Sequence, residues 1–134
     1  MPAHQKASVN AYLAQQTALR QLPPPMSFNS HGRGYPDISA VAVEGTSQSS
    51  PSMAGMFSMI TDHRLNAGLP PLGFFAPRLW AAMEQHPGVA FEDVVVGNTN
   101  TSCASGFAAS KGWDPATGWG RPIWPGMLEI FGSD

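Results

Sequence analysis

The clearest pattern of apolar and polar positions lies in the middle of the chain, just after residue 50. Four large apolar residues recur there at the i, i+3, i+4, i+7 spacing of one helix face: Met53, Met56, Phe57 and Ile60. Gly68 follows as a residue suited to a helix C-terminus. Gly55 costs about 1 kcal/mol relative to Ala in mid-helix, which indicates close approach of another backbone. We therefore predict the longest helix here, with the four apolar side chains buried.

Three shorter helices are predicted around it. Apolar residues near helical spacing predict a surface helix over roughly residues 5–16, ended by the prolines at 23–25. Pro77 suits a first helical turn and opens a second helix, which ends near residues 86–88. A short terminal helix closes the chain, and the segment from Phe91 to that helix is predicted to be irregular. The apolar residues assigned to the three helices are Val9, Tyr12, Leu13 and Leu19; Leu79, Trp80 and Met83; and Leu128, Ile130 and Phe131.

A short apolar run from Ile38 to Val43 predicts a buried strand directly before the longest helix. The chain then turns at Gly45 and Thr46, so that Ser47 lies at the helix N-terminus. Free N–H groups and the helix dipole favour developing negative charge there, and a serine hydroxyl in such a setting can act as a nucleophile. Ser and Thr are equally good helix caps, so residues 45–51 alone support both roles about equally.

Composition narrows the class of protein. The 134 residues suffice for one small domain or for part of a larger one, and 13 prolines with 14 glycines indicate many loops. Charged residues make up 12% and the net charge is −2, which gives no electrostatic support for binding nucleic acid or an anionic membrane. No apolar run approaches the ~20 residues of a membrane span, and no secretory signal follows Met1. A single cysteine, Cys103, excludes an internal disulfide.

Several motifs, taken in chain order, resemble one protein family. They are GRGYPDISA at 32–40, Gly-Thr-Ser-x-x-x-Pro at 45–51, LGF at 72–74 with PRL at 77–79, FEDV at 91–94, and GWDPATG at 112–118. Together they look like the C-terminal third of a sedolisin, a serine-carboxyl peptidase, and are most similar to the tripeptidyl-peptidase branch. The resemblance runs from about Pro2 to Phe131. The last motif separates sedolisins from subtilisins, which share their fold and the Gly-Thr-Ser motif.

The resemblance implies an α/β fold. Residues 1–134 would be the C-terminal portion of an incomplete peptidase domain, a fragment of a subtilisin-like parallel-sheet domain with long C-terminal loops. Ser47 matches the nucleophile of the family, whose members cleave peptide or protein substrates through an acyl-enzyme at acidic pH. Carboxylates acting as base and oxyanion partner account for such acid optima. Family members are secreted or lysosomal or vacuolar, whereas the residues of this chain do not indicate a compartment.

The resemblance also implies a Ca²⁺ site. Its ligands would be side-chain oxygens of Asp93 and Asp114 together with the backbone carbonyls of Val94, Ser110 and Gly112. This set agrees with calcium chemistry, because a hard cation takes six or more oxygens from carboxylates, loop carbonyls and water. Without the resemblance, loop capping and Asx-turns are the favoured roles of the two aspartates.

Three departures from the family are visible. Ser110 stands where the family usually has Gly, so it would be strained if that position needed a positive φ. Between Ala42 and Gly45 the family has a further strand-and-turn excursion, and here only Val43 and Glu44 occupy that place. The Glu that serves as general base, its helper Asp and the Asp that stabilises the oxyanion all lie upstream of the matched region in the family.

A base within this chain would have to come within about 3 Å of Ser47 Oγ, directly or through a water. Glu44, His31 and His63 are the candidates, and none is well placed in the predicted elements. The chain alone is therefore expected to be inactive and to self-associate through apolar surface left uncovered. A non-catalytic calcium-binding remnant is the main alternative. An unrelated nucleophile-elbow hydrolase is disfavoured because no Gly lies two residues after Ser47.

Overall fold

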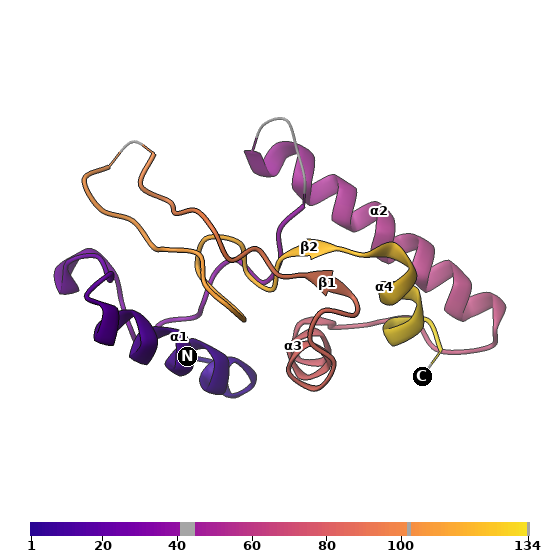
Figure 1. Cartoon of the computed structure of the whole chain (residues 1–134). Helices are drawn as coiled ribbons and strands as arrows, with labels where there is room; N and C mark the ends of the chain where they lie inside the picture. The colour runs from indigo at the N-terminus through magenta and orange to yellow at the C-terminus, as the bar shows by residue number, and fades with distance from the viewer. Residues whose placement is uncertain (41–44, 102, 134) are drawn as a thin grey trace. The chain divides into compact units, whose positions relative to one another are not determined.

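The computed structural model describes residues 1–40, 45–101 and 103–133. Four α-helices carry most of the regular structure, and the two described strands form an antiparallel pair (Figure 1). The elements are η1 Ala3–Gln5, α1 Lys6–Leu19, η2 Pro25–Ser27, α2 Gly45–Asn66, α3 Ala76–Gln85, β1 Phe91–Glu92, β2 Arg121–Pro122 and α4 Trp124–Phe131. The chain is thus mixed helix and strand, as an α/β fragment would be. A parallel sheet is not formed by the residues described.

The chain divides into two compact units. The first comprises Met1–Ile38 and Asp93–Gly120, and the second comprises Ser39–Glu92 and Arg121–Asp134. Each unit is therefore built from two segments that are distant in the sequence. Ser47 belongs to the second unit, whereas all five residues of the expected calcium site belong to the first.

In the first unit, α1 confirms the predicted N-terminal helix and continues three residues further, to Leu19. Its inner face buries Val9 and Tyr12, and Tyr12 meets the ring of Trp113 edge-on at 6.0 Å between centroids. The amide of Gln5 holds Gly34 from both sides, since Nε2 donates to the Gly34 carbonyl (3.3 Å) and Oε1 accepts from the Gly34 N–H (3.0 Å). These contacts join the start of the chain to the loop at residues 28–37.

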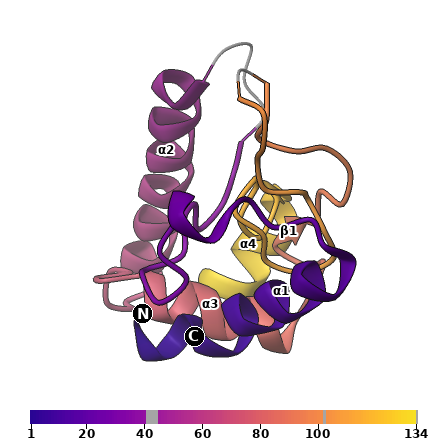
Figure 2. The same cartoon turned by 90° about the vertical axis from the view of Figure 1, so that its left-hand side faces the viewer.

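In the second unit, α2 is the longest helix and ends as predicted. The N–H of Gly68 (φ +76) donates to the Leu65 carbonyl and the N–H of Leu69 donates to the Arg64 carbonyl, the pair of bonds that defines a Schellman motif. In both views α4 lies against the C-terminal half of α2 (Figure 2). Arg64 fastens the two helices, because its buried guanidinium donates to the Phe131 carbonyl at 2.9 Å.

The predicted burial of the α2 stripe is only half right. Met53 and Ile60 are buried, at 7% and 0% exposed, whereas Met56 and Phe57 are half-buried. Phe57 contacts the Phe75 ring at 4.7 Å between centroids. No atom lies within 4 Å of a Cβ built on Gly55, so the expected close backbone approach is absent from the described part of the chain.

The α3 prediction is confirmed, because Leu79, Trp80 and Met83 are at most 2% exposed. The terminal helix is confirmed as α4, which buries Phe131 fully and leaves Leu128 and Ile130 half-buried. The N-terminal turn of α4 approaches the backbone at residue 89 so closely that a Cβ on Gly126 would lie 1.8 Å from the carbonyl oxygen there.

The structure corrects the predictions about strands. Residues 38–40 form no regular strand, and the rest of the predicted strand, 41–43, lies outside the described residues. The segment from Phe91 is not wholly irregular, because β1 pairs with β2 in the register Phe91↔Pro122 and Glu92↔Arg121. A salt bridge between the Glu92 and Arg121 side chains supports the pair at 2.5 Å.

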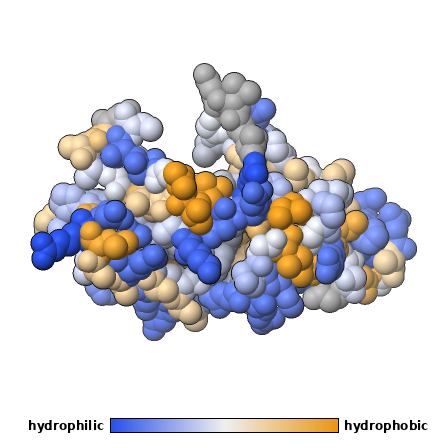
Figure 3. Space-filling view, viewed as in Figure 1, coloured by the Kyte–Doolittle hydropathy of each residue, from blue (hydrophilic) through white to orange (hydrophobic). Residues whose placement is uncertain are grey.

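The surface carries apolar as well as polar side chains (Figure 3). In the second unit Phe74 is 85% exposed, and Met59 and Leu65 on α2 are each more than half exposed. The expected self-association through apolar surface stays a prediction. Among the described residues, no helix is long and apolar enough to cross a membrane.

Candidate functional site

Ser47 lies in the first turn of α2 with its side chain exposed. Gly45 at the helix start has φ +53, a left-handed conformation that glycine adopts without strain. Pro51, four residues after Ser47, has no N–H, so the carbonyl of Ser47 cannot receive the usual helical hydrogen bond. The position predicted for Ser47 is therefore observed, and the first turn of α2 around it is incompletely hydrogen-bonded.

The candidate bases do not reach Ser47 within its own unit. His63 lies on the same helix sixteen residues later, which at 1.5 Å per residue is about 24 Å along the axis. His31 belongs to the first unit, where its Nδ1 lies 3.3 Å from Ser30 Oγ. Glu44 lies outside the described residues. Among those described in the second unit, no carboxylate or imidazole is hydrogen-bonded to Ser47 Oγ.

Two of the motifs that carried the family resemblance pack against each other in the first unit. Trp113 Nε1 donates to the Pro36 carbonyl at 2.8 Å, and the Trp119 N–H donates to the Asp37 carbonyl at 2.9 Å. Gly118, with φ +63, lies so near that a Cβ there would come within 2.5 Å of the Asp37 backbone. The glycine at this position is required by close packing as well as by backbone conformation.

Asp114 is fully buried and caps the turn that follows it. Its Oδ1 accepts from the N–H groups of Ala116 (2.9 Å) and Thr117 (2.8 Å) and from the Thr117 hydroxyl (3.2 Å). Its Oδ2 accepts from the Ser110 N–H at 2.9 Å. Burial raises the pKa of Asp114, while these hydrogen bonds act in the opposite direction. The Asx-turn interpretation of this residue is thus realised.

Asp93 is hydrogen-bonded to the same loop. Its Oδ2 accepts from the Gly112 N–H at 2.8 Å, and its Oδ1 is buried without a hydrogen-bond partner among the described residues. The two aspartates therefore accept hydrogen bonds from N–H groups only two residues apart, those of residues 110 and 112. Val94 follows Asp93 directly, so the fold brings all five sequence-predicted residues to one loop cluster.

The backbone answers the question of strain at Ser110. Among the described residues, Arg20 is the only one other than glycine with a positive φ, so Ser110 carries no left-handed backbone strain. Gly112, in contrast, has φ +84. Ser110 is 8% exposed, and its Oγ is buried with no hydrogen-bond partner among the residues that the structure describes.

The cluster contains two carboxylates, Asp93 and Asp114, both hydrogen-bonded to backbone N–H groups of one loop. The described residues hold no group of three or more histidine, cysteine or acidic side chains that could bind a metal. A site here would instead consist of two carboxylates completed by backbone and hydroxyl oxygens, which is a composition that calcium accepts. The unpartnered Oδ1 of Asp93 fits such a role.

Tyr12 supports this cluster and was predicted only as an apolar residue of a surface helix. Its hydroxyl donates to the Ala108 carbonyl at 2.9 Å, two residues before Ser110. Burial, with the charge of Asp114 as a second cause, raises the pKa of Tyr12 to about 12. The sequence held one signal of this role, because a buried tyrosine hydroxyl usually needs a hydrogen-bond partner.

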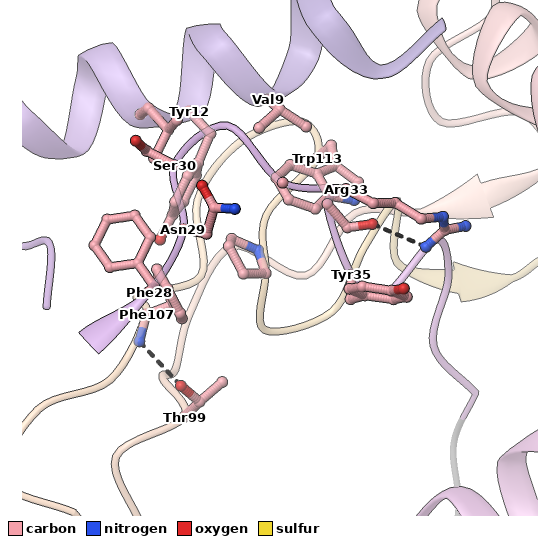
Figure 4. Close-up of a pocket in the computed structure, with 14 residues that line it drawn as sticks. Val9, Tyr12, Phe28, Asn29, Ser30, Arg33, Tyr35, Thr99, Phe107 and Trp113 are labelled. Carbon is pink, nitrogen blue, oxygen red and sulfur yellow. Dashed lines mark hydrogen bonds between the residues drawn. The ribbon is translucent and has the colours of Figure 1, made fainter. Parts of the chain in front are cut away.

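A cavity of about 480 Å³ also lies in the first unit, between α1 and the loops (Figure 4). Its wall includes Tyr12, Phe28, Phe107 and Trp113, and the Arg33 guanidinium lies 4.5 Å from the centre of the Tyr35 ring. Arg33 is itself paired with Asp37. The lining is mostly apolar, and it includes Ser30, whose hydroxyl lies 3.3 Å from the exposed His31 imidazole.

Comparison with known proteins gives consistent matches. Tripeptidyl-peptidase 1 from Bos taurus and from Homo sapiens are each 38% identical to the chain over 150 residues, covering 97% of this chain and 25% of theirs. Physarolisin from Physarum polycephalum is 36% identical over 146 residues, covering 96% of this chain and 25% of its own. No known protein-family model matches.

The chain therefore spans about a quarter of the length of the curated relatives it matches. The aligned length of 150 residues also exceeds the 134 residues of the chain, so the relatives contain residues without a counterpart here. The missing excursion before Gly45 stays a prediction.

Proposed function

Because this chain belongs to the sedolisin family of peptidases, we propose that it is the nucleophile-bearing part of a serine-carboxyl peptidase of tripeptidyl-peptidase type. The observation that supports this most is the match over 97% of the chain to tripeptidyl-peptidase 1. The exposed position of Ser47 in the first turn of α2 suits a nucleophile. In this proposal the complete catalytic domain is subtilisin-like and its substrates are peptides or proteins.

In the proposed reaction, Ser47 Oγ attacks the carbonyl carbon of the scissile peptide bond. The hydroxyl proton passes to a carboxylate base, the leaving amine takes a proton from that acid, and water then hydrolyses the resulting ester. The family resemblance assigns the base and the oxyanion partner to acidic residues outside these 134 residues. The chain by itself should therefore be inactive, since a serine without a base is a very weak nucleophile.

We propose further that Asp93 and Asp114 bind Ca²⁺ together with the carbonyls of Val94, Ser110 and Gly112. The support is their convergence on one loop and the unpartnered buried oxygen of Asp93. Bound calcium would neutralise two carboxylates in a mostly buried setting and tie the segment at 93–94 to the one at 110–114. In this proposal its role is structural, because it joins two loop segments that are distant in the sequence.

Calcium should raise the melting temperature of the purified chain through linkage to the native state. Asp114→Ala should abolish that response, while Asp62→Ala, which removes an exposed carboxylate on α2, should preserve it. A wild-type chain that melts at the same temperature with and without millimolar calcium would exclude the site.

A second candidate function is a calcium-binding remnant without catalysis. It is favoured by one observation: the described part of the second unit offers Ser47 no hydrogen-bonded base.

An assay of peptidase activity distinguishes the peptidase proposal from the calcium-binding remnant. The full product of the gene and the present chain should be assayed between pH 3 and 7 on peptides with a free N-terminus that release a tripeptide. The peptidase proposal expects turnover by the full product, none by its Ser47→Ala variant, and none by the chain alone. No turnover by the full product would favour the remnant, and Ser47-dependent turnover by the chain alone would contradict the assignment of the base to residues outside it.

A further inference from the structure

Two buried oxygen atoms without partners occur at the same loop of the first unit. One is Oδ1 of Asp93 and the other is the hydroxyl Oγ of Ser110, which belongs to a residue only 8% exposed. A buried polar atom left unpaired is unfavourable and is rare in folded proteins, so each such atom calls for an explanation. Two at one loop suggest a common missing partner.

The hydrogen bonds around the loop place these atoms in one neighbourhood. The Ser110 N–H donates to Asp114 Oδ2 at 2.9 Å, and the Gly112 N–H donates to Asp93 Oδ2 at 2.8 Å. The Ser110 hydroxyl is three bonds from its own N–H, and Asp93 Oδ1 shares a carboxyl carbon with the bonded Oδ2. One unpartnered oxygen therefore belongs to the segment 110–112, and the other belongs to a carboxylate that is hydrogen-bonded to this segment.

A serine at position 110 offers a hydroxyl that a glycine there would lack. Its backbone shows no positive φ, so the serine is accommodated without the strain that a left-handed conformation would impose. Glycine can offer a cation only its backbone carbonyl at this point, whereas serine offers a carbonyl and a hydroxyl. Calcium takes six to eight oxygen ligands in flexible geometry, so an additional neutral oxygen can be accepted.

We propose that the Ser110 hydroxyl is a further ligand that strengthens calcium binding at this loop beyond what the backbone carbonyl supplies. This inference rests on the calcium site proposed above. The calcium site proposed above uses only the backbone carbonyl of Ser110, whereas this inference adds the Ser110 hydroxyl as a ligand. A single buried water that pairs with the hydroxyl is the competing explanation, and it would leave calcium affinity independent of this side chain.

The test compares the wild-type chain with Ser110→Ala, which removes the hydroxyl and keeps the backbone carbonyl. Ser105→Ala is the matched control, because Ser105 lies in the same loop region with an exposed side chain. Calcium affinity is measured by calorimetry and by displacement of Tb³⁺, whose luminescence can be excited through the neighbouring Trp113. Melting temperatures are measured with calcium, with magnesium and without metal.

The inference expects Ser110→Ala to bind calcium about tenfold more weakly than wild type, a loss typical of removing a supporting polar group from a metal site. Without metal the same variant should melt no lower than wild type, because it no longer buries an unpartnered hydroxyl. Ser105→Ala should match wild type in both states. A general packing defect would lower the melting temperature both with and without metal, so it would not produce this combination of weaker calcium binding and an undiminished melting temperature without metal.

Equal calcium affinity of wild type and Ser110→Ala would overturn this inference and leave the five-ligand site standing. No calcium binding by wild type would overturn both the inference and the site. A Ser110→Ala variant that melts lower than wild type without metal, by the same margin as with calcium, would assign the hydroxyl to packing and would also refute the proposal.

Discussion

Gly118 offers a direct test of how the two motifs of the first unit are held together. A Cβ at this position would lie 2.5 Å from the carbonyl carbon and oxygen of Asp37 and 2.7 Å from the Ile38 nitrogen. These are backbone atoms, which cannot move aside as the end of a flexible side chain can. The residue also has φ +63, which disfavours any side chain. Gly118→Ala should therefore be strongly destabilising.

The magnitude has three parts. A left-handed conformation costs an alanine about 1–2 kcal/mol. Displacing packed backbone is an overpacking defect of about 1–3 kcal/mol. The shift also lengthens the Trp119 N–H to Asp37 carbonyl bond, now 2.9 Å, which contributes about 0.5–1.5 kcal/mol. Together they predict a loss of about 3–6 kcal/mol, a large share of the ~5–15 kcal/mol typical of a folded domain.

Gly112 is the matched control. Its φ is +84, but nothing lies within 4 Å of a Cβ built on it, so Gly112→Ala should lose only the conformational part, about 1–2 kcal/mol. Free energies of unfolding from urea titrations of the two variants and wild type give the comparison. Equal losses in the two variants would show that the contact with Asp37 contributes nothing, and the packing argument would be wrong.

Three further variants test other contacts. The pKa of Tyr12 is raised from 10 to about 12, so the unfolded chain loses this proton at a lower pH than the folded chain, and the free energy of unfolding should fall as pH rises from 10 to 12. Tyr12→Phe loses the hydrogen bond to the Ala108 carbonyl, and its free energy of unfolding should depend less on pH in this range. Arg64→Met should lower the free energy of unfolding, measured in urea, by about 1–3 kcal/mol, because it leaves the buried Phe131 carbonyl without this donor, and an unchanged value would contradict that role. Phe57→Ala should cost about 2 kcal/mol, less than the ~3–5 kcal/mol of a fully buried Phe, and a thermal shift matching the larger value would show that this ring is covered in solution.

Local patterns in the sequence determined the helices. The spacing of apolar residues and the terminating residues act within a few positions, so α1 and α3 were predicted with nearly correct bounds and α4 was predicted as a short terminal helix. The end of α2 at Gly68 and the placement of Ser47 in its first turn follow from the same short-range chemistry. The family was also evident from local motifs, and with it the five residues of the calcium proposal.

Contacts between distant segments were decided only by the tertiary structure. The half-burial of Phe57 depends on which neighbours cover it, and the pairing of β1 with β2 joins residues about thirty positions apart. The convergence of two loops likewise decides that Asp93 accepts a hydrogen bond from the Gly112 N–H. It also leaves the Ser110 hydroxyl without a hydrogen-bond partner among the described residues. Periodicity reports which face of an element is apolar, but it carries no information about which other segment meets that face or how fully it does so. The sequence thus specified the α-helices and the candidate residues, whereas the packing of distant segments decided the strand pair and which side-chain atoms are buried or hydrogen-bonded.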